Sequence, residues 1–271
     1  MKRLLSIELQ KLWQNRSSRI LTLTYFILLT SIALVSSINF KFVGVDFRLA
    51  DMGIYNFPFI WHFNTFIAGQ FKFFLAIIIV SMMANEYSNG ALKQNLIDGL
   101  NKKEFILSKF LTVVLFALIS TVYIFILTLI LGYSFSSYDE TAIVFMDLEY
   151  VFAYFLKLVG FFSFCLFLGI LIKRSAFALG FLFVWFIIEC ILIYMVRIPK
   201  VIYDLLPLEA MYSLIKQPFT RFKLYQTLEN QVSGASEIRD YQVHLSTIFI
   251  VIAWIVIIML MSYKILKKRD L

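Results

Sequence analysis

The sequence predicts an all-α membrane protein with six transmembrane helices. Hydrophobic residues occupy 61% of the 271 positions and charged residues only 15%, whereas ordinary globular chains carry about 25% charged residues. Six apolar runs have the length of about 18 to 20 residues that a helix needs to cross a bilayer. One polytopic domain therefore accounts for the whole chain, residues 1–271.

Each expected span is an apolar run bounded by polar or charged residues. The spans cover residues 20–40, 63–84, 110–133, 151–172, 175–196 and 246–263. Only the Lys173-Arg174 pair separates the fourth run from the fifth, which predicts a tight helical hairpin. The first run begins too late and is too long for a signal peptide, whose apolar region has about 7 to 15 residues, so we expect it to remain in the mature protein.

Lys and Arg residues are distributed unequally between alternate connections. One side collects 15 of them, including both termini, and the other side collects eight. Because basic connections stay in the cytoplasm, we predict that the N- and C-termini and residues 85–109 are cytoplasmic and that the loop 197–245 is extracytoplasmic. The net charge of +8 then favours contact with membrane lipids and not with nucleic acid.

Two segments outside the spans have helical patterns. Residues 1–19 carry one apolar helical face, which predicts an interfacial helix, although a basic anchor that only sets topology fits equally well. That face consists of Leu5, Leu9, Leu12 and Trp13. The loop 197–245 begins with apolar clusters between prolines, which predicts short re-entrant helices at the outer interface before span six.

The connection between spans two and three predicts a short amphipathic helix. Leu92, Leu96 and Leu100 recur every four residues, and Gly99 or Asn101 ends the pattern. A cytoplasmic helix with this apolar stripe needs lipid headgroups or a partner protein to cover it. The periodicity does not choose between them.

Three ionisable residues interrupt the spans at similar depth. Counted from the cytoplasmic ends, Lys72, Lys157 and Glu189 lie about 20 to 24 Å into the membrane, at about 1.5 Å per helical residue. Each lysine could extend its ammonium group to the outer headgroups. Alternatively, Glu189 pairs with Lys157 or Lys72, and the three residues form an intramembrane polar layer in the outer part of a substrate path.

The motifs of catalytic and metal sites are absent from the sequence. No G-x-x-x-x-G-K-[ST] phosphate cradle, G-x-G-x-x-G fingerprint or H-E-x-x-H pair occurs. Cys165 and Cys190 fall inside apolar runs, where they suit small buried hydrophobes. His62 and His244 lie far apart near the outer boundaries. We therefore predict no catalytic residue, no metal site and no enzyme activity in this chain.

Together, these features resemble the permease subunits of ABC-2 type ABC transporters over nearly the whole chain. The most specific resemblance is the loop "EYSNGALKQNLIDGLNKKEFILSK", which has a Glu, a Gly, a leucine-rich short helix, a turn, a basic residue and a Lys before span three. The matching positions are Glu86, Gly90, Leu92, Leu96, Gly99 to Asn101, Lys102 or Lys103, and Lys109. This sequence departs from the family's usual pattern at two positions. Ala91 stands where the family often has Thr, and Gly99 stands near the place where Pro is common.

The resemblance implies a coupling helix that docks on a separate ABC ATPase subunit, which would bind ATP and Mg, so that this chain needs no cofactor. The implied contact residues are Glu86, Gly90, Ala91, Leu92, Leu96, Leu100 and Lys102. A second permease copy or paralogue would complete the path for an unknown transported substrate, and the re-entrant helices would form its outer lid. The family places such permeases in the bacterial cytoplasmic (inner) membrane, and export is the expected direction.

Two other functions fit the sequence. A secondary transporter or channel would use the Lys/Glu layer as its ion site. Such sites usually lie where Gly or Pro breaks a helix near the middle of the membrane, whereas we expect few such breaks in the spans of this sequence. A membrane scaffold of a larger complex would use the outer loop as its contact surface. A neighbouring reading frame that encodes an ATPase would favour the permease.

Overall fold

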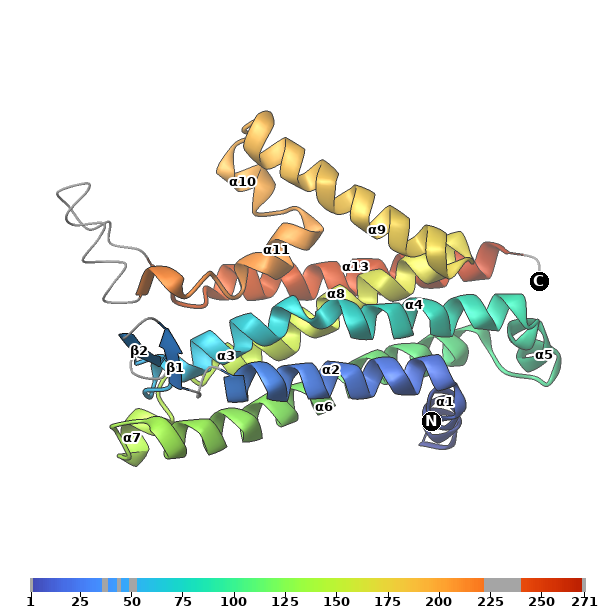
Figure 1. Cartoon of the computed structure of the whole chain (residues 1–271). Coiled ribbons are helices and arrows are strands. Elements are labelled where there is room, and N and C mark those ends of the chain that lie inside the picture. Colours follow the sequence, from blue (N-terminus) through green and yellow to red (C-terminus); the bar gives the residue numbers. More distant parts are fainter. Residues whose placement is uncertain (1, 36–38, 43–44, 49–52, 222–239, 270–271) are drawn as a thin grey trace.

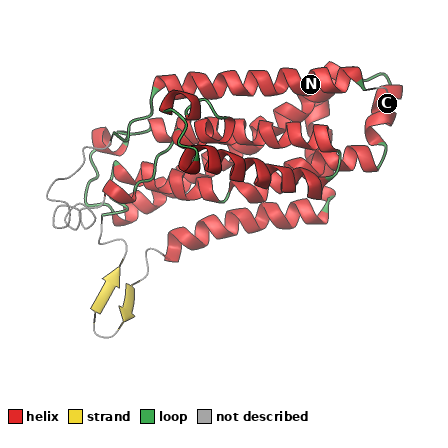
Figure 2. Ribbon diagram, turned by 90° about the horizontal axis from the view of Figure 1, so that it is seen from above, coloured by secondary structure: helices red, strands yellow, loops and turns green. Residues whose placement is uncertain are grey.

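The computed structural model describes residues 2–35, 39–42, 45–48, 53–221 and 240–269. In chain order, its elements are α1 (Lys2–Gln14), α2 (Arg16–Val35), β1 (Asn39–Phe42), β2 (Val45–Arg48), α3 (Phe59–Gln70), α4 (Lys72–Ser88), α5 (Ala91–Ile97), α6 (Lys102–Phe135), α7 (Thr141–Val144), α8 (Glu149–Ile172), α9 (Ser175–Cys190), the π-helical turn η2 (Ile191–Met195), α10 (Lys200–Tyr203), α11 (Pro207–Ser213), the 3₁₀ turn η3 (Phe219–Arg221) and α13 (Leu245–Lys268). The fold is therefore a helical bundle with one small antiparallel hairpin (Figure 2).

The two ends of the bundle carry different elements. Helices α1 and α5 and the end of α13 lie at one end, which we call the α5 end (Figure 1). The β1–β2 hairpin and α7 lie at the opposite end, which we call the hairpin end. The first described helix and the end of the last one thus lie at the same end.

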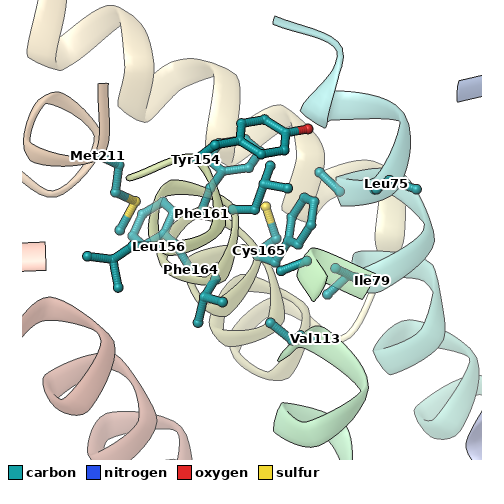
Figure 3. Packing of buried hydrophobic residues seen from close by; sticks show 14 of the residues in the cluster. Leu75, Ile79, Val113, Tyr154, Leu156, Phe161, Phe164, Cys165 and Met211 are labelled. Atoms are coloured by element: carbon teal, nitrogen blue, oxygen red, sulfur yellow. The ribbon is translucent and has the colours of Figure 1, made fainter. Parts of the chain in front are cut away.

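Helix α8 forms the centre of the bundle. In the apolar 18-residue stretch of this part of the chain, 83% of the residues are buried, compared with 17% in the corresponding stretches of α9 and of α13. Helices α4, α6, α9 and α13 pack around it, and Figure 3 shows Tyr154, Phe161 and Cys165 of α8 in the same buried cluster as Leu75 of α4. The outer helices leave their apolar faces exposed, as a lipid environment requires.

The predicted spans are recovered in part. Four described helices are long and apolar enough to cross a membrane, and the bent pair α3–α4 would make a fifth. The first predicted span, 20–40, corresponds to α2, which is not among them, and its crossing stays a prediction. Its predicted end is wrong, because α2 ends at Val35 and Asn39–Phe42 forms a strand paired with β2. Residues 36–38 lie outside the described part.

The second predicted span is broken near its middle. Helices α3 and α4 meet at Phe71 with a bend of 44°, and the Phe71 amide bonds three residues back to Ala68. Gly69 precedes the break, and glycine weakens a helix interior by about 1 kcal/mol relative to alanine. The sequence predicts few breaks within the spans, and the second span contains one.

The connection 85–109 is shorter in the structure than predicted. Helix α4 continues to Ser88, and α6 already begins at Lys102. Asn101 does not end α5, because it caps α6 in a capping box with Glu104. Gly99 has a φ of 93° and turns the chain between the two helices. With 34 residues, α6 is about 51 Å long and extends beyond a hydrocarbon core of about 30 Å.

The predicted re-entrant segments form short helices. Helix α9 diverges from α13, and α10 and α11 lie between them (Figure 1). Helix α11 contacts α8, α9 and α13, so the chain folds back into the bundle before α13. Within the predicted loop 197–245, residues 222–239 lie outside the described part.

A hydroxyl cluster fixes α2 to the bundle. Tyr25 of α2 hydrogen-bonds Ser120 of α6 at 2.5 Å and Tyr154 of α8 at 2.8 Å. Ser120 and Tyr154 are 2.9 Å apart, and all three residues are buried. Interhelical hydrogen bonds of this kind stabilise helix pairs in membranes by about 0.6 to 2 kcal/mol.

The close contact of α6 with Phe57 gives a first prediction. A Cβ atom on Gly132 would lie 2.1 Å from Cζ of Phe57, whose buried ring packs on Tyr133. We expect Gly132→Ala to lower the thermal unfolding midpoint in detergent, because overpacking costs about 1 to 3 kcal/mol. Gly180→Ala on α9, with no atom within 4 Å, is the matched control. An equal midpoint in the two variants would contradict this packing.

Candidate functional site

Helix α5 is attached to the bundle by the apolar stripe that the sequence predicts. Leu92 is 1% exposed and belongs to the core, and Leu96 and Leu100 pack against that core. The expectation that only lipid or a partner could cover this stripe is therefore wrong. Gly90 precedes the helix in a left-handed conformation with φ 67°, so the chain reverses sharply after α4.

The outward face of α5 has a different composition. Ile97 is 69% exposed, and the Gln94 amide donates to the Asp98 carboxylate at 3.0 Å. Lys93 is also exposed, and Ala91 is half-buried. A partner would therefore meet a mixed polar surface with one large apolar side chain, Ile97.

A buried cluster of ion pairs lies at the α5 end of the bundle. The Lys109 ammonium group on α6 donates to Oε2 of Glu8 on α1 at 2.5 Å and to Oε1 of Glu86 on α4 at 2.7 Å. Lys11 on α1 also donates to Oε1 of Glu86, at 3.1 Å. Lys109 is fully buried, and Glu8 and Glu86 are 6% and 5% exposed. Charged hydrogen bonds thus join α1, α4 and α6.

Glu8 belongs to this cluster but is not among the site residues predicted from the sequence. Its helical spacing with Leu5 and Leu12 is the signal that could have identified it. It lies between Leu5 and Leu12 on the face predicted to be apolar, and it points inward. Leu12 is buried as expected, but Trp13 is 59% exposed. The inward face of α1 therefore contacts the bundle through the Glu8 carboxylate as well as through apolar side chains.

Two residues implied as coupling contacts are already engaged within the chain. Glu86 belongs to the buried cluster, and Lys102 donates to the Arg269 carbonyl at 3.0 Å. Arg269 in turn donates to the Leu171 carbonyl at the end of α8, at 2.8 Å. These contacts fasten the C-terminal segment across the α5 end, and a basic side chain at a helix C-terminus also suits the helix dipole.

The three ionisable residues of the spans do not pair as predicted. Oε1 and Oε2 of Glu189 on α9 accept the backbone N–H groups of Leu208 at 3.2 Å and Glu209 at 2.9 Å. Glu189 therefore binds the first turn of α11, whose N–H groups have no partner within the helix. The Trp185 indole donates to the same carboxylate at 2.6 Å.

Lys157 touches the other end of the same short helix. Its ammonium group lies 3.4 Å from the Tyr212 carbonyl, and the side chain is 0% exposed, so it does not extend to the membrane surface. Lys72 at the start of α4 is half-buried, with its Nζ 4.3 Å from the centre of the Phe161 ring. No ion pair joins Lys157 or Lys72 to Glu189 among the described residues.

A pocket at the hairpin end is a feature that the sequence did not predict. It has a volume of about 620 Å³ and is bordered by Asp147, Tyr150, Arg221 and Tyr241, among others. His62 is buried beside it, stacked on Tyr150 with ring centres 4.2 Å apart, and its Nδ1 lies 3.1 Å from an Arg221 nitrogen. Within the described residues, no group of three or more His, Cys, Asp or Glu could hold a metal ion.

These observations define the class of the protein. Its long apolar helices are compatible with an integral membrane protein. Residues 23–271 match the model of a family described as "Protein of unknown function (DUF2705)", and the chain belongs to this family. No curated protein matches the chain.

The buried cluster predicts a strong effect of removing its shared cation. Lys109→Met would leave Glu8 and Glu86 buried with only Lys11 nearby, and breaking a buried ion pair costs about 3 to 5 kcal/mol. We expect a clearly lower thermal unfolding midpoint in detergent. Lys103→Met, at an exposed position earlier in α6, should change the midpoint little. Equal midpoints for the two variants would show that the cluster does not stabilise the fold.

The contact of Glu189 with α11 predicts a second, local effect. Glu189→Leu removes the acceptor of the Leu208 and Glu209 amides and of the Trp185 indole, and each unsatisfied buried donor costs about 1 to 3 kcal/mol. We expect faster proteolysis between α9 and α13 and a shifted Trp fluorescence. Glu140→Leu, at an exposed position, is the control. Unchanged proteolysis in Glu189→Leu would mean that this carboxylate does not hold α11.

Proposed function

We propose that this chain is the membrane-spanning permease subunit of an ATP-driven exporter of the ABC-2 type, and that α5 is its coupling helix. The observation that carries the proposal is the packing of α5 on α4 at the end of the bundle that holds the buried Lys109 cluster. A short helix that presents an outward face and packs on α4, which the cluster joins to α1 and α6, can pass a force from a bound protein into the bundle.

Charge and burial support this role for the α5 end. The cluster joins α1, α4 and α6 through contacts of 2.5 to 3.1 Å, so these helices resist separation when α5 is pushed. The Lys102–Arg269 contact adds the C-terminal segment. In this proposal the α5 end is cytoplasmic, since it carries both termini and the basic connections.

The remaining parts of the proposal concern the partners. A separate ABC ATPase subunit would bind ATP and Mg and would contact α5 around Ile97. A second permease copy or paralogue would face this one across the translocation path, in the bacterial cytoplasmic membrane. Helix α11, which returns between α9 and α13, would then act as the outer lid.

A second candidate function is favoured by the break in the second span. Discontinuous helices near the middle of the bilayer are typical of substrate and ion sites in secondary transporters. The 44° bend at Phe71, with Lys72 beside it, has this character. A self-sufficient secondary transporter would need no ATPase, and this separates the two candidates.

Co-purification decides between these functions. Tagged permease is expressed from its native locus, extracted in mild detergent and analysed for an ATPase that carries the G-x-x-x-x-G-K-[ST] cradle. We expect such a subunit in about stoichiometric amount, together with ATP hydrolysis in liposomes. If no ATPase is recovered and the liposomes take up solute along an ion gradient without ATP, the permease proposal is wrong and the second candidate stands.

The exposed face of α5 predicts a specific loss of partner binding. Ile97→Asp places a charge at a 69% exposed position, so the permease should fold normally while recovery of the ATPase falls about tenfold or more, as for a residue at the centre of an interface. Tyr138→Asp, at an exposed position near the hairpin end, is the matched control and should retain the ATPase. Full recovery with Ile97→Asp would exclude α5 as the docking helix.

A further inference from the structure

Two lysines converge where the second span is broken. Lys72 is the first residue of α4, directly after the bend at Phe71. Lys157 approaches the same place from the central helix α8, since its Nζ would lie 3.7 Å from a Cβ atom on Gly69, in the last turn of α3. The Nζ of Lys72 lies 4.3 Å from the centre of the ring of Phe161, one helical turn along α8 from Lys157. The fold therefore concentrates positive charge at the α3–α4 break.

Lys157 has little compensation for its burial. It is 0% exposed, and its one hydrogen bond in the described residues, to the Tyr212 carbonyl, is long at 3.4 Å. Its Nζ also lies 5.1 Å from the centre of the Tyr212 ring, and Glu209 on α11 forms no ion pair with it among the described residues. Because an isolated buried charge is costly, an anion beside Lys157 would stabilise this part of the structure.

The Glu189 carboxylate, which the sequence predicts as a partner of Lys157 or Lys72, forms hydrogen bonds with other groups. Both oxygens of Glu189 are engaged by the amides of Leu208 and Glu209, at the N-terminal end of α11. Lys157 contacts the carbonyl of Tyr212, near the C-terminal end of that helix. Helix α11 thus stands between the acid and the lysine, and the lysine is left to face the break.

The start of α4 adds a third positive element. Helix α4 has 17 residues, and no side chain caps its N-terminus at Phe71. The Phe74 amide donates to the Phe71 carbonyl at 3.2 Å, but the start of a helix still carries a partial positive charge, which favours an anion. Broken membrane helices direct such ends toward anionic substrate groups. Helix dipole and ammonium groups therefore act in the same direction.

We infer that the α3–α4 break, with Lys72 and Lys157, is a binding site for the anionic headgroup of an amphiphilic substrate. This inference rests on the proposed transport function, which it narrows to cargo with a phosphate or carboxylate group. The alkyl part of such a molecule would lie along the apolar surroundings, where Phe161 already contacts Lys72. Movement of α11 would expose Lys157 to the headgroup.

The test compares amphiphiles that differ only in headgroup charge. Protein purified in dodecyl maltoside is titrated with dodecyl phosphate and, separately, with dodecyltrimethylammonium, and binding is measured by calorimetry and by the shift of the thermal unfolding midpoint. We expect dodecyl phosphate to bind and to raise the midpoint, and the cationic amphiphile to do neither. Equal binding of the two amphiphiles would overturn the inference.

Variants locate the bound headgroup. Lys157→Met and Lys72→Met remove one charge each with little change of volume, and each should weaken dodecyl phosphate binding about tenfold or more, since charged hydrogen bonds are the strong ones. Lys93→Met on the exposed surface of α5 should not. Because the two lysine variants are made separately, the test can still be read if one of them fails to fold. Undiminished binding in both would overturn the site, whereas recovery of the ATPase tests the transport function separately.

Discussion

The Lys109 ammonium group between Glu8 and Glu86 is the interaction on which the α5 end depends. Glu8, Glu86 and Lys109 come from α1, α4 and α6 respectively. Lys11 adds a direct ion pair between α1 and α4. A buried cation stabilises a fold only while its anions stay in place, because an unpaired buried charge is costly. Helix α5 follows α4 and precedes α6, so the cluster joins the two helices that flank α5 in the chain.

The same constraint explains the arrangement at the middle of the bundle. Apolar surroundings require that every buried polar group find a partner, and α11 supplies partners at both of its ends. Its first amides meet the Glu189 carboxylate, and its Tyr212 carbonyl meets the Lys157 ammonium group. An acid at the N-terminus and a base near the C-terminus both suit the helix dipole. A seven-residue helix is thus held inside the bundle between α8 and α9.

The two regions suit different functions. The α5 end has buried charge contacts and an outward helix face, which suit contact with another protein. The α3–α4 break has two lysines with few partners in the described part of the chain, which suits contact with an anionic ligand. In a transporter both are needed, because energy must enter at one place and the cargo must bind at another. Only the first region distinguishes an ATP-driven permease from a secondary transporter.

The sequence by itself determined the helical fold, most span positions and the stripe of α5, since apolar runs and their periodicity depend on neighbours in the chain. It also identified Lys72, Lys157 and Glu189 as unusual. Only the tertiary structure decided their partners: the stripe packs on the protein's own core, Glu189 binds α11 amides, and Glu8 meets Lys109 across 101 positions of sequence. The bend at Phe71 is likewise a feature that only the tertiary structure shows. Partner choice depends on which helices pack together, and local pattern does not contain that information.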